Sequence, residues 1–282
     1  MNVLWVVAHP EPRSLTGVLA ADGRAALEEQ GHAVRVSDLY AMGWNPVVTG
    51  DDYRHPPDER LRVGEASQRA YRAGELPHDV VAEQEKLRWA DALVLHFPLW
   101  WFGVPAILKG WVDRVFVEGF AYGVRGDDGR TRRYGDGVLA GTRALVVTSA
   151  GGPSPVFGPR GINGHVDDLL FPLLHGTLFY AGAQVLPPLL LAGADRFTDA
   201  DADRARAELR ERLAQIGTAT PLAYRPQRGG DYDERLVLLP HLAPGRVGVG
   251  VHRGDDVGAA RHPSPSAGSS CLLPPRAPLS TG

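Results

Sequence analysis

The sequence predicts an α/β fold in which five parallel strands form a doubly wound sheet with helices on both faces. Short apolar runs of strand length alternate with longer helical patterns from the first residues to about Tyr224. The runs are almost continuously apolar, as expected of strands that are buried on both faces. Right-handed helical crossovers and the strand order 2-1-3-4-5 account for this alternation.

The strands are predicted from five apolar runs. These runs cover residues 2–8, 33–37, 91–97, 143–149 and 184–191. The last run contains Pro187 and Pro188, which lack the N–H group that a sheet needs, so we expect an interruption there.

Helices are predicted between and after these strands, over residues 15–30, 79–89, 105–116, 166–180 and 199–216. Ser14 is suited to cap the first helix and Asp79 the second. Pro105 is suited to the first turn of the third helix, because its missing N–H has no partner there in any case.

The chain divides into three parts. Residues 1–224 are predicted to form the folded domain, 225–252 an extended C-terminal arm, and 253–282 a disordered tail rich in Gly, Pro, Ser and Arg. Within the domain, residues 41–77 and 118–141 are longer than a simple connection requires. We expect both to be surface excursions, the first with a local role.

Composition excludes several classes of protein. The net charge of -3 argues against a general nucleic-acid binder. The single Cys271 excludes an intrachain disulfide and leaves too few thiolates for a cysteine-based metal site, so no metal site is predicted. No apolar run approaches the ~20 residues that span a bilayer. The N-terminus enters an apolar strand without a leader pattern, so a cytoplasmic location is expected.

The loop after the first predicted strand is suited to an anion. It leads from His9 to the start of a helix, where free N–H groups and the helix dipole attract a phosphate. Arg13, Ser14 and Thr16 add donors. The loop lacks both the G-x-G-x-x-G and the G-x-x-x-x-G-K-[ST] pattern, which excludes those two nucleotide-binding turns. The alternative is that Ser14 is an N-cap and nothing more.

Three consecutive aromatics follow the third predicted strand. Pro98 and Leu99 lead into Trp100, Trp101 and Phe102, and Gly103 follows. Aromatic faces stack on planar ligands, and open α/β sheets bind ligands at the carboxyl ends of their strands. The alternative is a buried aromatic plug in the core.

The fourth predicted strand ends in Ser149-Ala150-Gly151-Gly152, where the backbone can approach a ligand closely. The alternative is an ordinary glycine turn. In the predicted strand order, this loop, the aromatic segment and the first loop are neighbours. Together they describe a site for a planar ring with a phosphate-bearing tail, and a flavin fits that description.

Several motifs, in the right order, resemble the NAD(P)H:quinone oxidoreductases of the diaphorase type, which share the flavodoxin-like fold. The similar segments extend to about Pro221 and include AHPEPRS at 8–14, SDLYAM at 37–42, WNP at 44–46, DVVAEQ at 79–84, WFGVPAILKGW at 101–111 and GFAY at 119–122.

This resemblance implies a homodimer with two flavins, FAD rather than FMN, at the subunit interface. The flavin contacts that it implies are His9, Leu15, Thr16, Leu99, Trp100, Trp101, Phe102, Ser149, Ala150, Gly151 and Gly152. Ser14 and Pro98, in the same loops, are also expected to bind the cofactor. The ring would stack at Trp101 and Phe102, with the N–H groups of residues 150–152 at its N1/O2 edge. Tyr122 and either Phe179 or Tyr180 would enter the substrate pocket, and we select Phe179.

The implied reaction is ping-pong. NAD(P)H reduces the flavin at N5 and leaves, and a quinone-like acceptor then takes two electrons in the same slot. Arg125, Arg130, Arg132 and Arg133 either favour the additional phosphate of NADPH or are simply solvated.

The catalytic positions depart from the family pattern. The family places a tyrosine and a histidine beside the flavin, and these correspond here to Phe157 and Asn163. Phe157 cannot exchange a proton and Asn163 does not titrate. The hypothesis is therefore that backbone dipoles at Gly151 and Gly152 stabilise the reduced ring. His165 is either an alternative proton donor or a helix cap.

Two other functions stay open. One is azo or nitro reduction on FMN, although the long 41–77 excursion favours FAD. The other is a role as an ancillary subunit of a potassium-efflux system, with little turnover.

Overall fold

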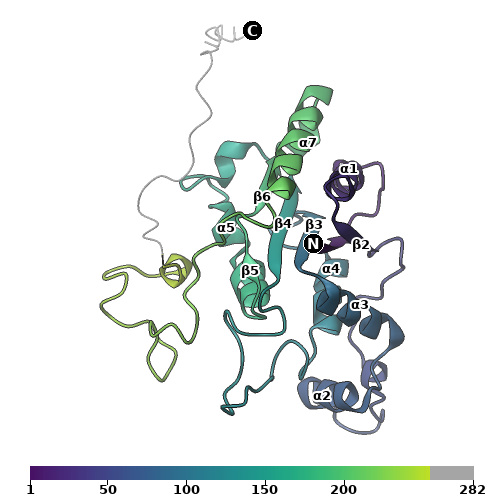
Figure 1. The fold of residues 1–282 in the computed structure, drawn as a ribbon, viewed down its shortest axis with the longest axis vertical. Helices are drawn as coiled ribbons and strands as arrows, with labels where there is room; N and C mark the ends of the chain where they lie inside the picture. The colour runs from purple at the N-terminus through teal and green to yellow at the C-terminus, as the bar shows by residue number, and fades with distance from the viewer. Residues whose placement is uncertain (255–282) are drawn as a thin grey trace, which may run out of the picture.

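The computed structural model describes residues 1–254, and its centre is a parallel sheet in the order β2-β1-β3-β4-β5 (Figure 1). The main strands are β1 (Asn2–Val7), β2 (Ala33–Asp38), β3 (Ala92–Pro98) and β4 (Arg143–Ala150). The fifth position holds β5 (Gln184–Val185) and β6 (Leu189–Ala192), which both pair with β4. The predicted strand order is confirmed, and so is the interruption at Pro187 and Pro188.

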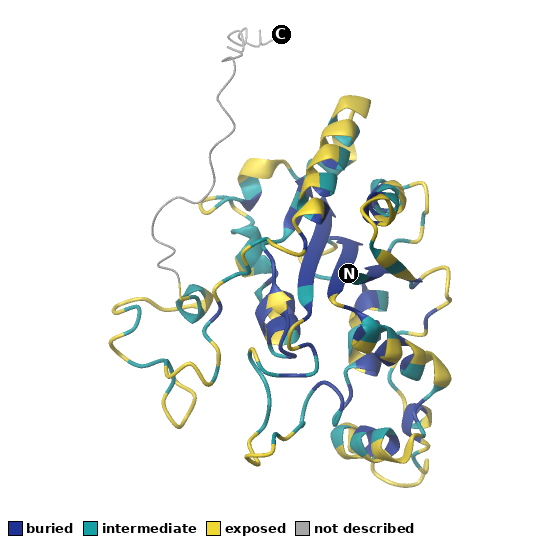
Figure 2. Cartoon of the chain, in the orientation of Figure 1, coloured by how far each residue is buried: buried dark blue, intermediate teal, exposed yellow. Residues whose placement is uncertain are grey.

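Helices cover both faces of the sheet. On one face α1 (Leu15–Glu29) and α7 (Asp199–Ala214) bury a layer that includes Trp5, Leu19 and Leu209. On the other face α3 (His78–Trp89) and α4 (Ala106–Val115) pack over Leu93 and Leu95. Figure 2 shows the strands as the buried centre and α7 with its outer side exposed.

Two helices begin one residue away from the start that the sequence predicts. α3 begins at His78, so Asp79 lies in its first turn, where its carboxylate accepts from the N–H of Val80 and from Arg114. Pro105 precedes α4 instead of lying in its first turn. Its extended backbone, with ψ of 146°, turns the chain into the helix.

The prediction of one helix over residues 166–180 was wrong. The segment forms α5 (Val166–Leu169), α6 (Phe171–Leu173) and a π-helical turn over Leu174–Phe179. Pro172 explains the break, because a proline inside a helix removes a hydrogen bond and collides with the preceding turn. In the π turn the N–H of Tyr180 donates to the carbonyl of His175, five residues earlier, at 3.0 Å.

The excursion over residues 41–77 contains α2 (Val63–Ala73) and a 3-10 turn, Gly50–Tyr53, that the sequence did not reveal. Arg114 of α4 holds it through a hydrogen bond to Asp52 at 2.8 Å, and the same side chain donates to Asp79 of α3 at 2.7 Å. Three further 3-10 turns span Ser154–Phe157, Ala194–Arg196 and Val249–His252.

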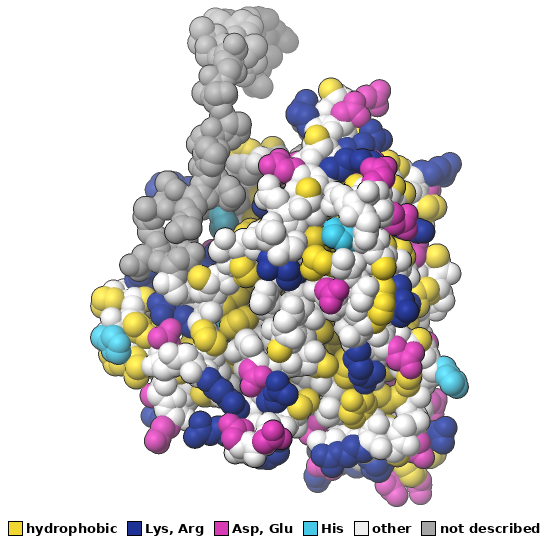
Figure 3. Space-filling view, in the orientation of Figure 1, with side chains coloured by type: hydrophobic (Ala, Val, Ile, Leu, Met, Phe, Trp, Pro, Cys, Tyr) yellow, Lys and Arg dark blue, Asp and Glu magenta, His cyan; other side chains and the backbone are white. Residues whose placement is uncertain are grey.

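Residues 225–254 form an irregular arm that, in Figure 1, lies on the opposite side of the molecule from α2. Arg253, assigned from sequence to the tail, is packed against Asp167 at 2.9 Å. The remainder of the predicted tail lies outside the described residues. On the face in Figure 3, acidic and basic side chains are interspersed.

Candidate active site

The aromatic segment after β3 forms an exposed turn at the carboxyl edge of the sheet. The N–H of Leu99 donates to Ser149 at 2.8 Å, which extends the pairing of β3 with β4, and Gly103 closes the turn onto Trp100 at 3.0 Å. Trp101 is 98% exposed and Phe102 is 48% exposed. These exposures exclude the alternative of a buried aromatic plug.

The backbone of this turn is strained. Trp101 and Phe102 have φ angles of 50° and 60°, in the left-handed region where non-glycine residues cost roughly 1–2 kcal/mol each. Such conformations persist where the surrounding structure enforces them, and they cluster at binding sites. The turn therefore holds two large, exposed aromatic residues in a backbone conformation that carries an energetic cost.

A hollow of about 250 Å³ joins this turn to the glycine loop after β4. Its lining comes from both segments and from the loop that follows: Leu99, Trp101, Phe102, Ala150, Gly151, Gly152, Phe157 and Asn163. None of these side chains titrates near neutral pH. The predicted ring-binding residues thus line one hollow together with Phe157 and Asn163, the two residues that depart from the family pattern.

The glycine loop is supported by residues that the sequence did not single out. A Cβ on Gly151 would lie 2.1 Å from Oδ2 of Asp195, so the Asp195 carboxylate lies directly against this glycine. The N–H of Gly193 donates to the carbonyl of Gly152 at 2.7 Å. Only the fold brings the loop after β6 to this position, and no local sequence signal marks Asp195.

The first loop reaches the same edge. The rings of His9 and Trp100 lie 6.1 Å apart. Nδ1 of His9 accepts from the N–H of Glu11 at 3.0 Å, which places the proton of a neutral ring on Nε2. Ser14 is the N-cap of α1, with its side-chain oxygen accepting from Gly17 at 3.1 Å. Leu15 is partly buried, and Thr16 is buried in the first turn of α1.

His96 is a buried polar residue in β3 that the sequence did not suggest. It is fully buried, neither ring nitrogen has a hydrogen-bond partner in the described residues, and its ring lies 5.8 Å from that of Trp5. Burial, together with the nearby charge of His9, lowers the pKa of His96 to about 3. The ring is therefore neutral at physiological pH.

The loop that contains Phe157 and Asn163 is closed by a hydrogen bond within its own backbone. The N–H of Asn163 donates to Val156 at 3.0 Å, and the Phe157 ring is 3.4 Å from the position that a Cβ of Gly152 would take. His165 is the N-cap of α5, and its Nδ1 accepts from the N–H of Asp167 at 3.3 Å. This hydrogen bond assigns His165 a capping role.

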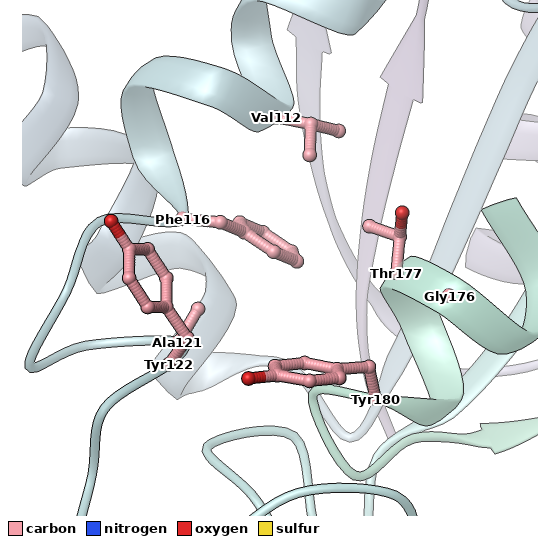
Figure 4. A pocket seen from close by; sticks show the side chains of 7 residues that line it. All are labelled: Val112, Phe116, Ala121, Tyr122, Gly176, Thr177 and Tyr180. Carbon is pink, nitrogen blue, oxygen red and sulfur yellow. The ribbon is translucent and has the colours of Figure 1, made fainter. Parts of the chain in front are cut away.

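A second hollow, of about 200 Å³, lies between α4, the 121–122 segment and the π turn (Figure 4). The rings of Phe116, Tyr122 and Tyr180 surround it. Phe179, selected from sequence, does not line this hollow but is buried against His175 and Tyr224, with ring distances of 5.5 and 5.2 Å. Tyr180, the alternative that the sequence left open, lines the hollow.

The arginines near residue 130 are partly committed to other contacts. Arg132 pairs with Asp136 at 2.9 Å, Arg133 donates to Gln227 at 2.7 Å, and Arg125 donates to the carbonyl of Gly129.

Within residues 1–254, no cluster of acidic, histidine or cysteine side chains is arranged to hold a metal ion. In the same part of the chain, no helix combines the length and apolarity needed to cross a membrane.

Comparisons with known proteins give a consistent result. Residues 1–216 match the family described as having a flavodoxin-like fold. A ribosyldihydronicotinamide dehydrogenase-like protein from Penicillium crustosum is 44% identical over 263 residues, covering 91% of this chain and 97% of the relative. The ribosyldihydronicotinamide dehydrogenase [quinone] of Mus musculus is 37% identical over 227 residues, covering 80% of this chain and 96% of the relative.

Among solved structures, a quinone reductase described as putative, from Klebsiella pneumoniae, has a TM-score of 0.86 and 47% identity. The match covers 90% of this chain and 99% of that structure. With the fold, the strand order and these relatives in agreement, the chain belongs to the NAD(P)H:quinone oxidoreductase family of enzymes with a flavodoxin-like fold.

Proposed function

We propose that this enzyme uses a flavin to transfer two electrons from a dihydronicotinamide donor to a quinone. The observation that carries this proposal is the Trp101–Phe102 platform, which stands exposed and faces the glycine loop across one hollow. A planar ring can stack on such aromatic faces. The strained backbone of the turn supports the same function, because the structure holds both rings out of the core.

The residues present fit a flavin. Trp101 and Phe102 would hold the ring, the N–H groups of residues 150–152 would face its polar edge, and the N-terminus of α1 would receive the phosphate. The first turn of α1 has no acidic residue that would repel a phosphate. A bound flavin would supply hydride-accepting chemistry, and the protein's part is to bind, orient and tune it.

We propose that backbone dipoles, and no side-chain acid, stabilise negative charge at the glycine loop. Phe157 has no exchangeable proton, and the Asn163 amide can donate a hydrogen bond without titrating. Replacing His165 with alanine would test this proposal. Because His165 caps α5, the variant should lose stability of about 0.5–2 kcal/mol while flavin reduction slows by less than ~10²-fold. A deeper loss of rate would identify His165 as the proton donor.

The donor and the acceptor would use the same slot in turn, which is a ping-pong scheme.

Two relatives are named for ribosyldihydronicotinamide, a donor without the adenosine phosphate part of NADPH. The contacts of Arg125, Arg132 and Arg133 with protein groups also leave those three side chains less available for the 2′-phosphate of NADPH. We therefore propose a preference for the riboside or NADH over NADPH.

We propose a homodimer in which the Tyr122–Tyr180 hollow of one subunit closes over the platform of the other. Trp101 is almost fully exposed in a single chain, and a planar slot needs a second wall. The second hollow is apolar, ringed by aromatics, and shares no residue with the first.

The test is purification followed by titration. The protein should be yellow, and mass spectrometry of the released flavin should give FAD. Anaerobic titration with ribosyldihydronicotinamide, NADH and NADPH should bleach the flavin, and menadione should restore its colour. FMN in place of FAD, with faster reduction of azo or nitro compounds than of menadione, would support the alternative function. A colourless protein that takes up neither flavin would refute the proposal.

A further inference from the structure

The end of the C-terminal arm returns to its base and is fastened there. Tyr224 and Arg253 form an isolated antiparallel bridge, and the N–H of Arg225 donates to His252 at 2.9 Å. The N–H of Gly254 donates to Ala223 at 2.6 Å. The arm is therefore a closed loop whose last described residues lie against the body of the domain.

Arg253 joins the end of this closed loop to α5. Its guanidinium donates to Oδ2 of Asp167 at 2.9 Å, and the two side chains are only 11% and 13% exposed. The guanidinium also lies 5.5 Å from the centre of the Tyr224 ring. When one partner of an ion pair that is removed from water in this way is lost, the folded protein is strongly destabilised, because the other charge stays buried without compensation.

Asp167 lies in α5, immediately after the loop that contains Phe157 and Asn163. α5 has four residues, none of them fully buried, and Val166 packs its first turn against the core. Its cap, His165, is joined to Asp167 through the 3.3 Å hydrogen bond from the Asp167 N–H. At its other end the loop is anchored through Gly152, which accepts from Gly193. Arg253 thus adds a buried ion pair at the end of the loop that continues into α5.

We propose that Arg253 is a positioning residue, which acts through Asp167 to hold the 153–165 loop, and with it Phe157 and Asn163, against the ligand hollow. This role rests on the proposed function, since Phe157 and Asn163 line the hollow assigned to the flavin ring. A connection of this kind makes the arm part of the active-site architecture, although no residue of the arm lines the hollow itself.

Amide hydrogen exchange on the full-length, flavin-loaded protein tests this proposal. Arg253→Met should increase exchange of residues 156–167 at least tenfold and raise the KM for menadione more than it lowers kcat. Arg253→Lys, which keeps a cation near Asp167, should restore much of the protection. Arg228→Met is the matched control, because it removes another arm ion pair, at 3.2 Å to Asp128, that does not contact α5.

Unchanged exchange at 156–167 in Arg253→Met would overturn the proposal, and so would an equal effect in Arg228→Met. If Arg253→Met fails to fold, Asp167→Asn replaces it, because the amide keeps a hydrogen-bond acceptor but loses the charge. Exchange is also measured on the protein without flavin. If the protein takes up no flavin, the proposed function fails. Faster exchange in flavin-free Arg253→Met than in the flavin-free native chain would still show that Arg253 holds the loop.

Discussion

The Asp195 carboxylate lies against the Cα of Gly151, so closely that a methyl group on Gly151 would sit 2.1 Å from Oδ2. At Gly152 the same methyl group would meet only the Phe157 and Val156 side chains, at an ordinary 3.4 Å. The two neighbouring glycines therefore differ in what they tolerate. The difference arises from a contact between the loop after β4 and the loop after β6, which no sequence motif encodes.

Gly151→Ala is expected to weaken flavin binding by up to about tenfold, equivalent to ~1.4 kcal/mol, because the exposed Asp195 side chain must rotate away from the new methyl group. Gly152→Ala is the matched control and should bind flavin more tightly than Gly151→Ala. The double variant Gly151→Ala/Asp195→Ala removes the obstructing carboxylate and should recover binding. Fluorescence titration of the apoprotein with FAD measures all three. If the double variant binds as poorly as Gly151→Ala, the contact with Asp195 is not the cause.

Two chains with different defects should complement each other if the site is shared between subunits. Trp101→Ala and Tyr122→Ala should each lose most quinone reductase activity, and neither removes a core side chain, because Trp101 is 98% exposed and Tyr122 lines an open hollow. In a mixed dimer, one site would combine intact Trp101 from one subunit with intact Tyr122 from the other. Co-expression with two different tags, followed by double purification, should therefore restore activity. A mixed dimer as inactive as its parents would contradict the shared site.

Stability should fall as the pH decreases below about 6.5. Burial lowers the pKa of His96 to about 3, and burial followed by the charge of His252 lowers that of His175 to about 4. Between those values and the unfolded pKa of about 6.5, the unfolded chain binds more protons, so stability is fully present above pH 6.5 and decreases below it. Each histidine should contribute a loss of roughly 2 kcal/mol between pH 7.5 and 5.0.

Urea unfolding at several pH values measures this slope. His175→Phe is the informative variant, because the imidazole stacks on Phe171 at 4.5 Å and a phenyl ring can keep that contact. The variant should show a smaller pH dependence than the native chain. An unchanged slope would mean that His175 is not one of the titrating groups.

The sequence was sufficient for the sheet and for the meeting of the predicted ring-binding residues at its edge, since both follow from local patterns and a general rule of α/β folds. The apolar runs defined the strands, and Trp101, Phe102 and Gly151 met at the carboxyl edge as expected. α2 was missed because the face that it buries consists of small residues, Ala66, Ser67 and Ala70, which give a weak apolar signal.

Contacts that depend on tertiary structure could not be predicted. Tyr180 and not Phe179 lines the second hollow, next to a π turn that a 3.6-residue period does not anticipate. The Asp195–Gly151 contact and the Arg253–Asp167 ion pair join segments 44 and 86 residues apart. Neither spacing carries a local signal, so only the folded chain reveals them.

The ion pairs of Arg114 should make it one of the most sensitive positions in α4. Its side chain is 5% exposed and donates to Asp52 and Asp79, which holds the 41–77 excursion to the domain. Arg114→Met leaves the buried Asp52 carboxylate without its partner, so we expect a loss of roughly 3–5 kcal/mol in the free energy of unfolding. Lys109→Met, on the same helix, is the control, because its pair with Asp113 is exposed and worth at most about 1 kcal/mol. Urea unfolding measures the free energy of unfolding of both variants. An equal loss in the two would mean that the Arg114 contacts contribute no more than a surface pair.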